Sequence, residues 1–502
     1  MVQSTSKTGA VESAACCAAG SAVNDDKHVN GQSMFAKGAA EIFTAAQVAS
    51  KRSALIGPNS ALSFDEPLYI VQGKAQYLYD AEGNQYLDCC NNVAHVGHCH
   101  PKVTAAVTKQ LETLNTNSRY LHDKLVVLAE RITHKMPEPL RVMYAVCSGS
   151  EANDLALRVA RANVPGAWHV AVMEGAYHGH TTATLDLSPY KFDGPGGMGK
   201  PPHVHVLPCP DVYRGSHLDG RAAAQAAVEA AHQAGGCISA FYCESILSCG
   251  GQVVLPAGYL QDVYQVMHEE GALCIADEVQ CGFGRVGSHF WGFQLQSVVP
   301  DMVTLGKPIG NGFPMGAVIM SQKLAKGFSN GMEYFNTCGG CTAAAAAGVA
   351  VLEAIEEDKL QQNADDVGTY LIHSLQALQK EYPCIGHVRG LGLFVGIEMV
   401  IPGSKQPAPA TAKFVKEGLK IRRILVSTDG HHNHVIKIKP PMCFDRSNAD
   451  SLVTHLVDLM KLGMPVAVQE LDRAYDPEKK STRIQNTTWQ SFHVTDSQQL
   501  TT

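Results

Sequence analysis

Short apolar runs and amphipathic segments alternate along residues 140–305. The runs at 142–147, 169–173, 238–243 and 272–276 are rich in Val, Ile, Ala and Cys, as buried strands are. Segments with the apolar spacing of helices separate them. This alternation predicts an α/β fold with an open, mainly parallel sheet. In such sheets, ligands bind beyond the carboxyl ends of the strands.

Further elements are expected on both sides of this region. Short β-prone runs lie within residues 69–88, and Pro101 is expected to open a helix, because proline suits the first helical turn. An alanine-rich helix at 342–357 is expected to lead into a smaller domain. Helices are predicted there at 363–380 and 448–461, with strands within 385–397.

The pattern divides the chain into five parts. These are a disordered tail at 1–50, a segment at 51–100 that packs with the small domain, a large domain at 101–341, the small domain at 342–465, and a disordered tail at 466–502. Both tails are polar or rich in small residues and lack periodicity. Within the large domain, the Pro/Gly-rich residues 188–220 are predicted to form a loop that borders the active site.

Two kinds of charged residue stand at the ends of apolar runs. Asp277 and Glu278 close the run at 272–276, and Lys307 lies between another apolar run and Pro308. Burying an unpaired ammonium is costly, but a Schiff base removes that cost, and burial lowers the pKa of the amine. A carboxylate nearby could hold a pyridinium nitrogen protonated. The residues alone also allow a loop lysine and an aspartate that caps a helix.

Other strand ends carry candidates as well. The turn Ser148-Gly149-Ser150 precedes an amphipathic helix, so amide groups at the helix start could bind a phosphate, although either serine could be a plain N-cap. Tyr177 could lie on a planar cofactor or be an ordinary loop residue, and Glu244 ends the next run. Because all these candidates converge on one rim of the sheet, we predict a site there.

The composition of the chain limits the kinds of partner and cellular environment that we expect for the protein. The chain has 502 residues, a net charge of -7 and a pI near 6.3, which favours neither nucleic acid nor an anionic membrane as a partner. The longest apolar stretch, residues 342–352, is too short to span a bilayer. Sixteen cysteines scattered through so long a chain are typical of reduced, intracellular thiols.

Several clusters have spacings that metal or redox sites use. Cys338 and Cys341 form a CxxC without a second pair nearby, and His431, His432 and His434 flank a polar turn. A zinc site needs more ligands at defined spacing. We therefore expect no metal site at these clusters, nor at the similar pair His98 and His100.

Five strings carry a more specific signal: SGSEAND, AYHGH, ADEVQCGFGRVG, LGKPIGNG and EYFNT. They resemble those of class III aminotransferases, pyridoxal phosphate enzymes of fold type I, over roughly residues 50–460. The resemblance implies a large domain with a mostly parallel, seven-stranded sheet. It also implies a smaller α+β C-terminal domain and pyridoxal 5′-phosphate as the cofactor.

The resemblance implies a role for each matching residue. Lys307 resembles the Schiff-base lysine, and Asp277 resembles the partner of the pyridine nitrogen. Tyr177 resembles the aromatic that stacks on the ring, with Val279 on the opposite face and Gln280 near the ring hydroxyl. The phosphate cradle and further cofactor contacts are expected from Ser148, Gly149, Ser150, His178 and Glu244.

Thr337 resembles the threonine that reaches the cofactor phosphate of the partner subunit. This implies a homodimer, with a tetramer as the larger alternative. The family string TYGGNP reads TCGGCT here, from Thr337 to Thr342. The Asn-Pro entry to the next helix is therefore absent, and proline normally pre-sets the first turn. We expect the local geometry at the dimer interface to differ from that of the family.

Longer strings point to one branch of the family: LIGP, NNVAHVGHCHP, LNTNSRYLHD, SPYKF, ESILSCGGQ and VIKIKPPMCF. They resemble the alanine–glyoxylate-aminotransferase-2-like proteins. Characterised members of that branch include ethanolamine-phosphate phospho-lyase and 5-phosphohydroxy-lysine phospho-lyase. The branch name implies transamination, whereas the member names imply elimination. The choice between the two reactions therefore depends on the residues at the site.

Two positions favour elimination. The ω-aminotransferases that the chain resembles use an arginine for the substrate carboxylate and a glutamate that neutralises it. Here the glutamate position holds Cys249 and the arginine position holds Lys437. Lysine lacks the fork with which arginine binds a carboxylate through two bonds. An elimination needs no such switch, because it involves no second amino substrate.

The preferred hypothesis is a phospho-lyase that acts on phosphoethanolamine or 5-phosphohydroxylysine and releases an aldehyde, ammonia and phosphate. Lys307 would remove the proton from the carbon that bears the nitrogen. Substrate contacts are expected from Asn91, Arg119, His180 and Lys437. The alternatives are an ω-aminotransferase such as alanine–glyoxylate transaminase, and an inactive homologue that binds the cofactor.

The N-terminal residues give a weak targeting signal. Residues 1–50 carry three lysines and no arginine, which makes a poor signal peptide and a weak mitochondrial presequence. The family resemblance favours the mitochondrion, with the cytosol as the alternative.

Overall fold

The structure, a computed structural model, describes residues 43–477. The described residues divide into two units, with the boundary between Gly57 and Pro58, and most of both predicted tails lies outside the described residues. The first unit contributes helix α1 (Ala45–Leu55). Its capping box, in which Thr44 and Gln47 each accept from the other's backbone amide, stabilises the helix start. The prediction of disorder is therefore wrong for residues 45–50.

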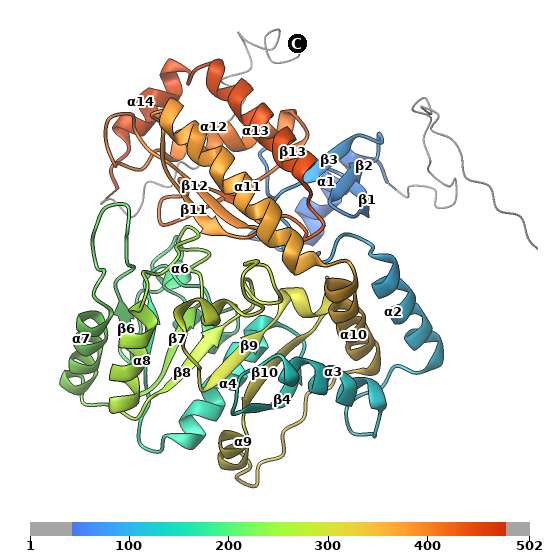
Figure 1. Ribbon diagram of the computed structural model, residues 1–502, viewed down its shortest axis with the longest axis vertical. Coiled ribbons are helices and arrows are strands. Elements are labelled where there is room, and N and C mark those ends of the chain that lie inside the picture. Colours follow the sequence, from blue (N-terminus) through green and yellow to red (C-terminus); the bar gives the residue numbers. More distant parts are fainter. Residues whose placement is uncertain (1–42, 478–502) are drawn as a thin grey trace, which may run out of the picture. The chain divides into compact units, whose positions relative to one another are not determined.

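A seven-stranded sheet organises the second unit (Figure 1). Its strand order is β4-β10-β9-β8-β7-β5-β6. The strands are β4 (Leu140–Val146), β5 (His169–Met173), β6 (Val204–Leu207), β7 (Ile238–Glu244), β8 (Leu273–Asp277), β9 (Met302–Leu305) and β10 (Gly316–Ser321). Only β10 runs antiparallel to its neighbours in this sheet. The predicted fold class, with its mostly parallel sheet, is confirmed.

Both faces of this sheet are buried, as the continuous apolar runs require. On β7, Ala240 and Tyr242 belong to one hydrophobic core, while Phe241 and Cys243 belong to the other. Helix α4 (Gly149–Asn163) contributes to the first core. The second core includes residues of α3 (Asp123–His134), α7 (Gly220–Gln233), α8 (Tyr259–Glu269) and α10 (Thr342–Glu357). Successive side chains of a strand point to opposite faces of the sheet. Each face therefore packs against its own layer of helices.

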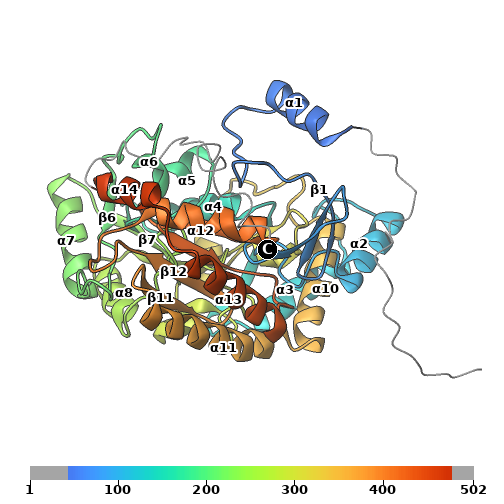
Figure 2. The ribbon, with the colours of Figure 1, turned by 90° about the horizontal axis from the view of Figure 1, so that it is seen from above.

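A second sheet, of order β11-β12-β15-β14, is wholly antiparallel. Its strands are β11 (Ile385–Leu391), β12 (Phe394–Met399), β14 (Ser427–Asp429) and β15 (Val435–Ile438). The accompanying helices are α11 (Leu360–Glu381), α12 (Pro409–Ile421) and α13 (Arg446–Lys461). Figure 2 looks down on this orange and red layer. Strand β15 matters most for function, because Lys437 lies on it and Lys439 follows it directly.

Strands from the N-terminal part of the second unit share a third sheet with one strand from its C-terminal part. Strands β1 (Ile70–Lys74), β2 (Tyr77–Asp80) and β3 (Gln85–Asp88) form a meander, and β3 pairs in parallel with β13 (Ile424–Leu425). The chain then enters α2 (Pro101–Thr113), which begins at the predicted proline. The remaining short helices are α5 (Thr182–Asp186), α6 (Pro189–Phe192) and α9 (Gln322–Phe328).

Two predictions for irregular segments are wrong. Residues 188–220 are not one loop, because β6 lies within them and pairs in parallel with β5 at the edge of the sheet. The stretch after residue 466 is not disordered throughout, because it forms α14 (Val466–Ala474). Buried Asp472 anchors that helix by accepting from the amides of Ala410 and Thr411, at 2.7 and 3.0 Å, at the start of α12. An acid that caps another helix cannot be recognised from local periodicity.

Within residues 43–477, no single helix is long and apolar enough to cross a bilayer, although one bent pair, α13 with α14, passes on length and composition.

The packing of α11 on the β11–β12 hairpin depends on two glycines. A Cβ at Gly368 would lie 2.1 Å from the backbone oxygen of Gly392, so the helix could not keep its position. We expect Gly368→Ala to lower the free energy of unfolding by about 2–3 kcal/mol, a typical cost of overpacking. Urea unfolding would measure it. Gln376→Ala, on an exposed position of α11, should change stability little, and equal effects of the two variants would contradict the packing argument.

Candidate active site

Three ionisable side chains lie at the carboxyl ends of adjacent parallel strands. Glu244 ends β7, Asp277 ends β8, and Lys307 follows β9 after one glycine. The strand register pairs Glu244 with Asp277, and Asp277 with Thr304. The three side chains are therefore neighbours on the rim where open α/β sheets bind ligands.

A cavity of about 110 Å³ opens at this rim. It is lined by Gly149, Ser150, Asn153, Tyr177, His178, Gly179, Glu244, Asp277, Val279, Gln280 and Lys307. Nearly all residues predicted to contact the cofactor are among them. Ser148 and Thr337 are not, and the exposed Thr337 keeps its predicted role toward a partner subunit as a prediction only.

Asp277 is held by hydrogen bonds on both carboxylate oxygens. Its Oδ2 lies 2.8 Å from His178 Nδ1 and accepts from Asn153 Nδ2 at 2.7 Å, and its Oδ1 accepts from the amide of Val279 at 3.0 Å. These bonds fix the carboxylate at the cavity wall, although it is only 3% exposed. An anion at this position can hold a proton on a ring nitrogen.

Lys307 lies in a setting that favours its neutral amine. Burial lowers its pKa below the ordinary value, and the Asp277 carboxylate opposes this effect only in part. A neutral amine is the form that attacks an aldehyde and accepts a proton. Burial also raises the pKa of Glu244 to about 7, and the negative charge of Asp277 adds to that rise.

The start of α4 forms one side of the cavity. Gly149 is its first residue, and a Cβ there would lie 2.7 Å from Val279 Cγ1, so only glycine allows this close approach. Ser150 lines the cavity, and amides of a first helical turn can bind an anion. The Ser148 hydroxyl instead accepts from the amide of Glu151 as the N-cap. This contact is that of a plain N-cap, and the predicted place of Ser148 in the phosphate cradle stays a prediction.

Pyridoxal phosphate fits this arrangement of residues. Asn153 Oδ1 and His178 Nε2 are buried and have no hydrogen-bond partner among residues 43–477, as expected of polar atoms that face a ligand. Asp277 would hold the ring nitrogen, the α4 turn would hold the phosphate, and Lys307 would hold the aldehyde carbon. Tyr177 and Val279 line the same cavity and could flank a flat ring.

Glu278, the neighbour of Asp277, has a different task. It is fully buried, and its carboxylate accepts from the amides of Gly292 and Phe293, both at 2.8 Å, and from the Ser245 hydroxyl. Burial raises its pKa, and these bonds counter the rise. Of the two consecutive acids, one therefore serves the cavity and the other fixes the backbone beside it.

The predicted substrate residues do not line the cavity. Arg119 is exposed and pairs with Glu333 at 2.9 Å. His180 is exposed, and its backbone amide donates a hydrogen bond to Ser150 Oγ at 3.1 Å. Asn91 accepts from the amide of Val93 at 3.2 Å, within its own loop. None of these three residues lines the cavity that residues 43–477 form, and their substrate contacts stay predictions.

Lys437 and Cys249, the two positions that depart from the ω-aminotransferase pattern, lie close to each other. Lys437 Nζ lies 2.8 Å from Asp429 Oδ2. Burial acts to lower the pKa of Lys437, but Asp429 and then Cys249 raise it above its ordinary value. The amide of Gly430, next to Asp429, donates to the Cys249 backbone oxygen at 3.0 Å. Lys437 also contributes to the electrostatics of Lys307, so it is a cation near the site.

Three polar residues at the site were not found from the sequence. Asn153 lies one turn after Gly149 and bonds to Asp277; a polar residue on the apolar face of α4 could have indicated it. Asn92, not Asn91, donates to Gln280 Oε1 at 3.2 Å. Lys439 donates to the same oxygen at 2.9 Å. Its position directly before a Pro-Pro pair is the sequence feature that could have indicated it.

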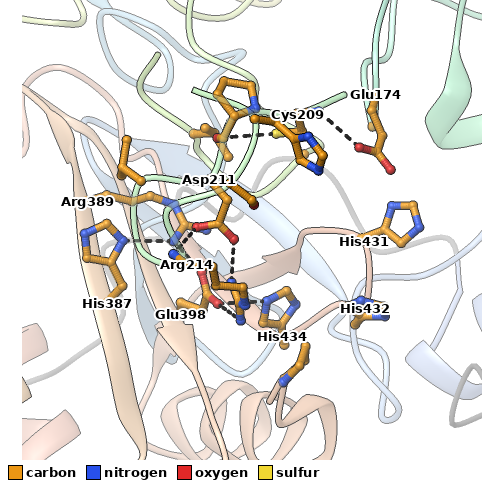
Figure 3. Close-up of a pocket in the computed structure, with 18 of the residues that line it drawn as sticks. Glu174, Cys209, Asp211, Arg214, His387, Arg389, Glu398, His431, His432 and His434 are labelled. Carbon is orange, nitrogen blue, oxygen red and sulfur yellow. Dashed lines mark hydrogen bonds and ion pairs between the residues drawn. The ribbon is translucent and has the colours of Figure 1, made fainter. Parts of the chain in front are cut away.

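A larger cavity, of about 400 Å³, lies beside Glu174 and the antiparallel sheet (Figure 3). Its charges already satisfy one another, since Glu398 pairs with Arg214 at 2.6 Å and with Arg389 at 2.5 Å. Arg214 also pairs with Asp211 at 2.8 Å. Both arginines are therefore paired with carboxylates, and we assign this cavity no substrate.

Comparison with known proteins agrees with the geometry. The family model described as Aminotransferase class-III matches residues 61–460. An "Alanine--glyoxylate aminotransferase 2-like" protein of Drosophila melanogaster is 50% identical, covering 77% of this chain and 81% of the relative. An "Ethanolamine-phosphate phospho-lyase homolog 1" of Caenorhabditis elegans is 40% identical, covering 83% and 93%. The human "Alanine--glyoxylate aminotransferase 2, mitochondrial" is 39% identical, covering 79% and 83%.

A solved structure is similar over nearly the same range. It is a phospholyase from Arthrobacter in complex with phosphoethanolamine, 38% identical, with a TM-score of 0.79, and the match covers 83% of this chain and 100% of that chain. The predicted family, fold type and cofactor are confirmed, and the protein is an enzyme whose relatives include both lyases and aminotransferases. The chain therefore belongs to the class III aminotransferases, which use pyridoxal phosphate.

Proposed function

We propose that the protein is a phospho-lyase that eliminates phosphate from a phosphorylated amine, either phosphoethanolamine or 5-phosphohydroxylysine. The products are an aldehyde, ammonia and inorganic phosphate. The observation that carries the proposal is the pair Cys249 and Lys437 at the edge of the site. A transaminase of this family relies on glutamate and arginine there to accept two unlike substrates.

The names of the relatives support the proposal without deciding it. One relative is called a phospho-lyase homologue, and the Arthrobacter protein is a phospholyase that was solved with phosphoethanolamine. Other relatives are called alanine–glyoxylate aminotransferases, which supports the runner-up, an ω-aminotransferase. A third hypothesis is an inactive homologue that binds the cofactor.

Lys307 would carry the proton transfer. The cofactor supplies an electron sink when it is bound. Lys307, freed by the substrate amine, takes the proton from the carbon that bears the nitrogen. The C–O bond to the phosphate on the adjacent carbon then breaks, and water releases the aldehyde and ammonia. Asp277 would hold the proton on the ring nitrogen. Because ammonia is released and the cofactor is left as its aldehyde, the reaction needs no second amino substrate.

Purified protein with added cofactor tests this proposal directly. Phosphoethanolamine and 5-phosphohydroxylysine are supplied in separate reactions, and phosphate and ammonia are measured. Alanine with glyoxylate runs in parallel, with pyruvate as the readout. Equal amounts of phosphate and ammonia from one phosphorylated amine would support the lyase. Pyruvate without phosphate release would establish the transaminase instead.

Lys437 is the cation that we assign to the substrate phosphate. We expect Lys437→Gln to raise KM for the phosphorylated amine about 10- to 100-fold, the size expected for a charge-assisted hydrogen bond. Phosphate release at varied substrate concentration measures it. Arg119→Ala serves as the comparison, because Arg119 is exposed and paired with Glu333. A larger effect from Arg119→Ala would move the phosphate contact to Arg119.

We further propose a homodimer in the mitochondrion. Thr337 is exposed and lies outside its own cavity, so its predicted contact with a cofactor phosphate needs a second subunit. The human relative is named as mitochondrial, which supports that location over the cytosol. Sedimentation of the holoenzyme would test the dimer, and imaging of the tagged full chain would test the location.

A further inference from the structure

Lys439 is a second lysine at the active site, and it is completely buried. Its Nζ donates to Gln280 Oε1 at 2.9 Å and to the Ser248 hydroxyl, and it lies 4.4 Å from the ring centroid of Phe394. Burying an amine so completely is costly unless its donors are used. The contacts around Lys439 therefore have to explain why the position holds a lysine.

The contact with Gln280 fixes which way that side chain points. The amide of a glutamine has an oxygen that accepts and a nitrogen that donates, and the two ends are nearly equal in shape. A lysine ammonium only donates, so the end of Gln280 that faces Lys439 must be the oxygen. Asn92 also donates to this oxygen, at 3.2 Å, but an asparagine amide could turn and accept instead. Lys439 is thus the group that sets the orientation.

The other end of the Gln280 amide is left for the cavity. Gln280 lines it together with Lys307 and Asp277. Within residues 43–477, no hydrogen bond from Gln280 Nε2 to a protein acceptor is formed. The cofactor carries a phenolic oxygen beside the carbon that Lys307 attacks, and such an oxygen accepts hydrogen bonds.

We propose that Lys439 is a positioning residue that locks the Gln280 carboxamide with its NH2 toward the phenolic oxygen of the cofactor. Lys439 acts through Gln280 and need not touch the cofactor or the substrate. The inference rests on the bound cofactor and holds for a lyase and a transaminase alike, so it is independent of which reaction is proposed.

Several charges surround this contact. Burial lowers the pKa of Lys439 to about 7, with Lys437 adding to the decrease and Asp429 and Cys249 opposing it. Lys307 lowers it further. Lys439 donates two hydrogen bonds, to Gln280 Oε1 and to the Ser248 hydroxyl. A neutral amine also has two N–H groups, so both contacts can be kept in either protonation state.

The absorption spectrum of the bound cofactor reports on this contact. The nitrogen that joins the cofactor to Lys307 loses its proton as pH rises, and the absorption changes with it. A donor on the phenolic oxygen stabilises negative charge there and weakens its attraction for that proton. We expect Lys439→Met to raise the midpoint of the spectral change by about one pH unit, as the loss of such a hydrogen bond does. Gln280→Ala should raise it by a similar amount.

The double variant separates this mechanism from a direct charge effect. If Lys439 acts through Gln280, Lys439→Met combined with Gln280→Ala should shift the midpoint no more than Gln280→Ala alone. Additive shifts would show that Lys439 acts directly on the cofactor and would overturn the proposal, as would an unchanged midpoint in Lys439→Met. Phosphate release is not needed for either measurement, so failure of the proposed reaction leaves this test intact.

Two further variants guard against a merely structural effect. Lys420→Met removes another buried lysine, one that donates to the backbone oxygen of Glu66 far along the chain, and should leave the midpoint unchanged. A shifted midpoint in Lys420→Met would show that loss of any buried lysine perturbs the cofactor site through the fold. That result would overturn the proposal. If Lys439→Met does not fold, Lys439→Gln is used in its place, because its amide can donate or accept and no longer fixes Gln280. Its midpoint should rise in the same direction.

Discussion

Replacing Lys307 with alanine should lower the rate of phosphate release by at least about 10⁴-fold, because the variant loses both the covalent attachment and the general base. The cofactor should still bind, since Asp277 and the start of α4 remain. Its absorption should change to that of the free aldehyde or of an adduct with added amine. Phosphate release and the absorption spectrum of the purified variant measure the two effects separately.

Two controls make that loss specific. Lys307→Arg keeps a cation in the cavity but cannot act as a base at neutral pH, so it should be as inactive as the alanine variant. Small alkylamines should restore part of the activity of Lys307→Ala, because an external amine can take the proton. Activity of Lys307→Ala within tenfold of the wild type, without added amine, would remove Lys307 from the mechanism.

The sequence predicted the frame of the fold because its signals are local. The runs at β5, β7 and β8 are continuous and apolar, so both faces had to be buried. Strand β6 has only four residues and lies between prolines, which hid it inside a predicted loop. Helix α14 depends on a bond from Asp472 to α12, and no local pattern reports a contact 62 residues away.

The site was predictable to the extent that it lies at strand ends. Asp277, Glu244 and Lys307 follow apolar runs, and the topology of a parallel sheet brings such positions together. Their supporting groups depend on side-chain direction across the fold. Lys439 reaches Gln280 over 159 residues, and only packing of the antiparallel sheet against the large one creates that contact. Periodicity could not show that Ser148 turns its hydroxyl back to its own helix.

Replacing Asp277 with asparagine should lower the rate of phosphate release by about 10²- to 10³-fold, the usual cost of removing one preorganised electrostatic contact. Asparagine has nearly the same shape but no charge, so it cannot hold the proton on the ring nitrogen. The fold around it should persist, since His178 can change its tautomer and the Asn153 amide can turn. Rates are compared at equal cofactor occupancy, which the absorption spectrum determines.

A carbocyclic analogue of the cofactor, with carbon in place of the ring nitrogen, gives this prediction its sharpest form. The wild-type enzyme loaded with the analogue should lose about as much activity as Asp277→Asn does with the natural cofactor, because each change removes one side of the same contact. The variant loaded with the analogue should lose no more. A full further loss in that combination would mean that Asp277 acts elsewhere, through the three hydrogen bonds that hold the cavity wall.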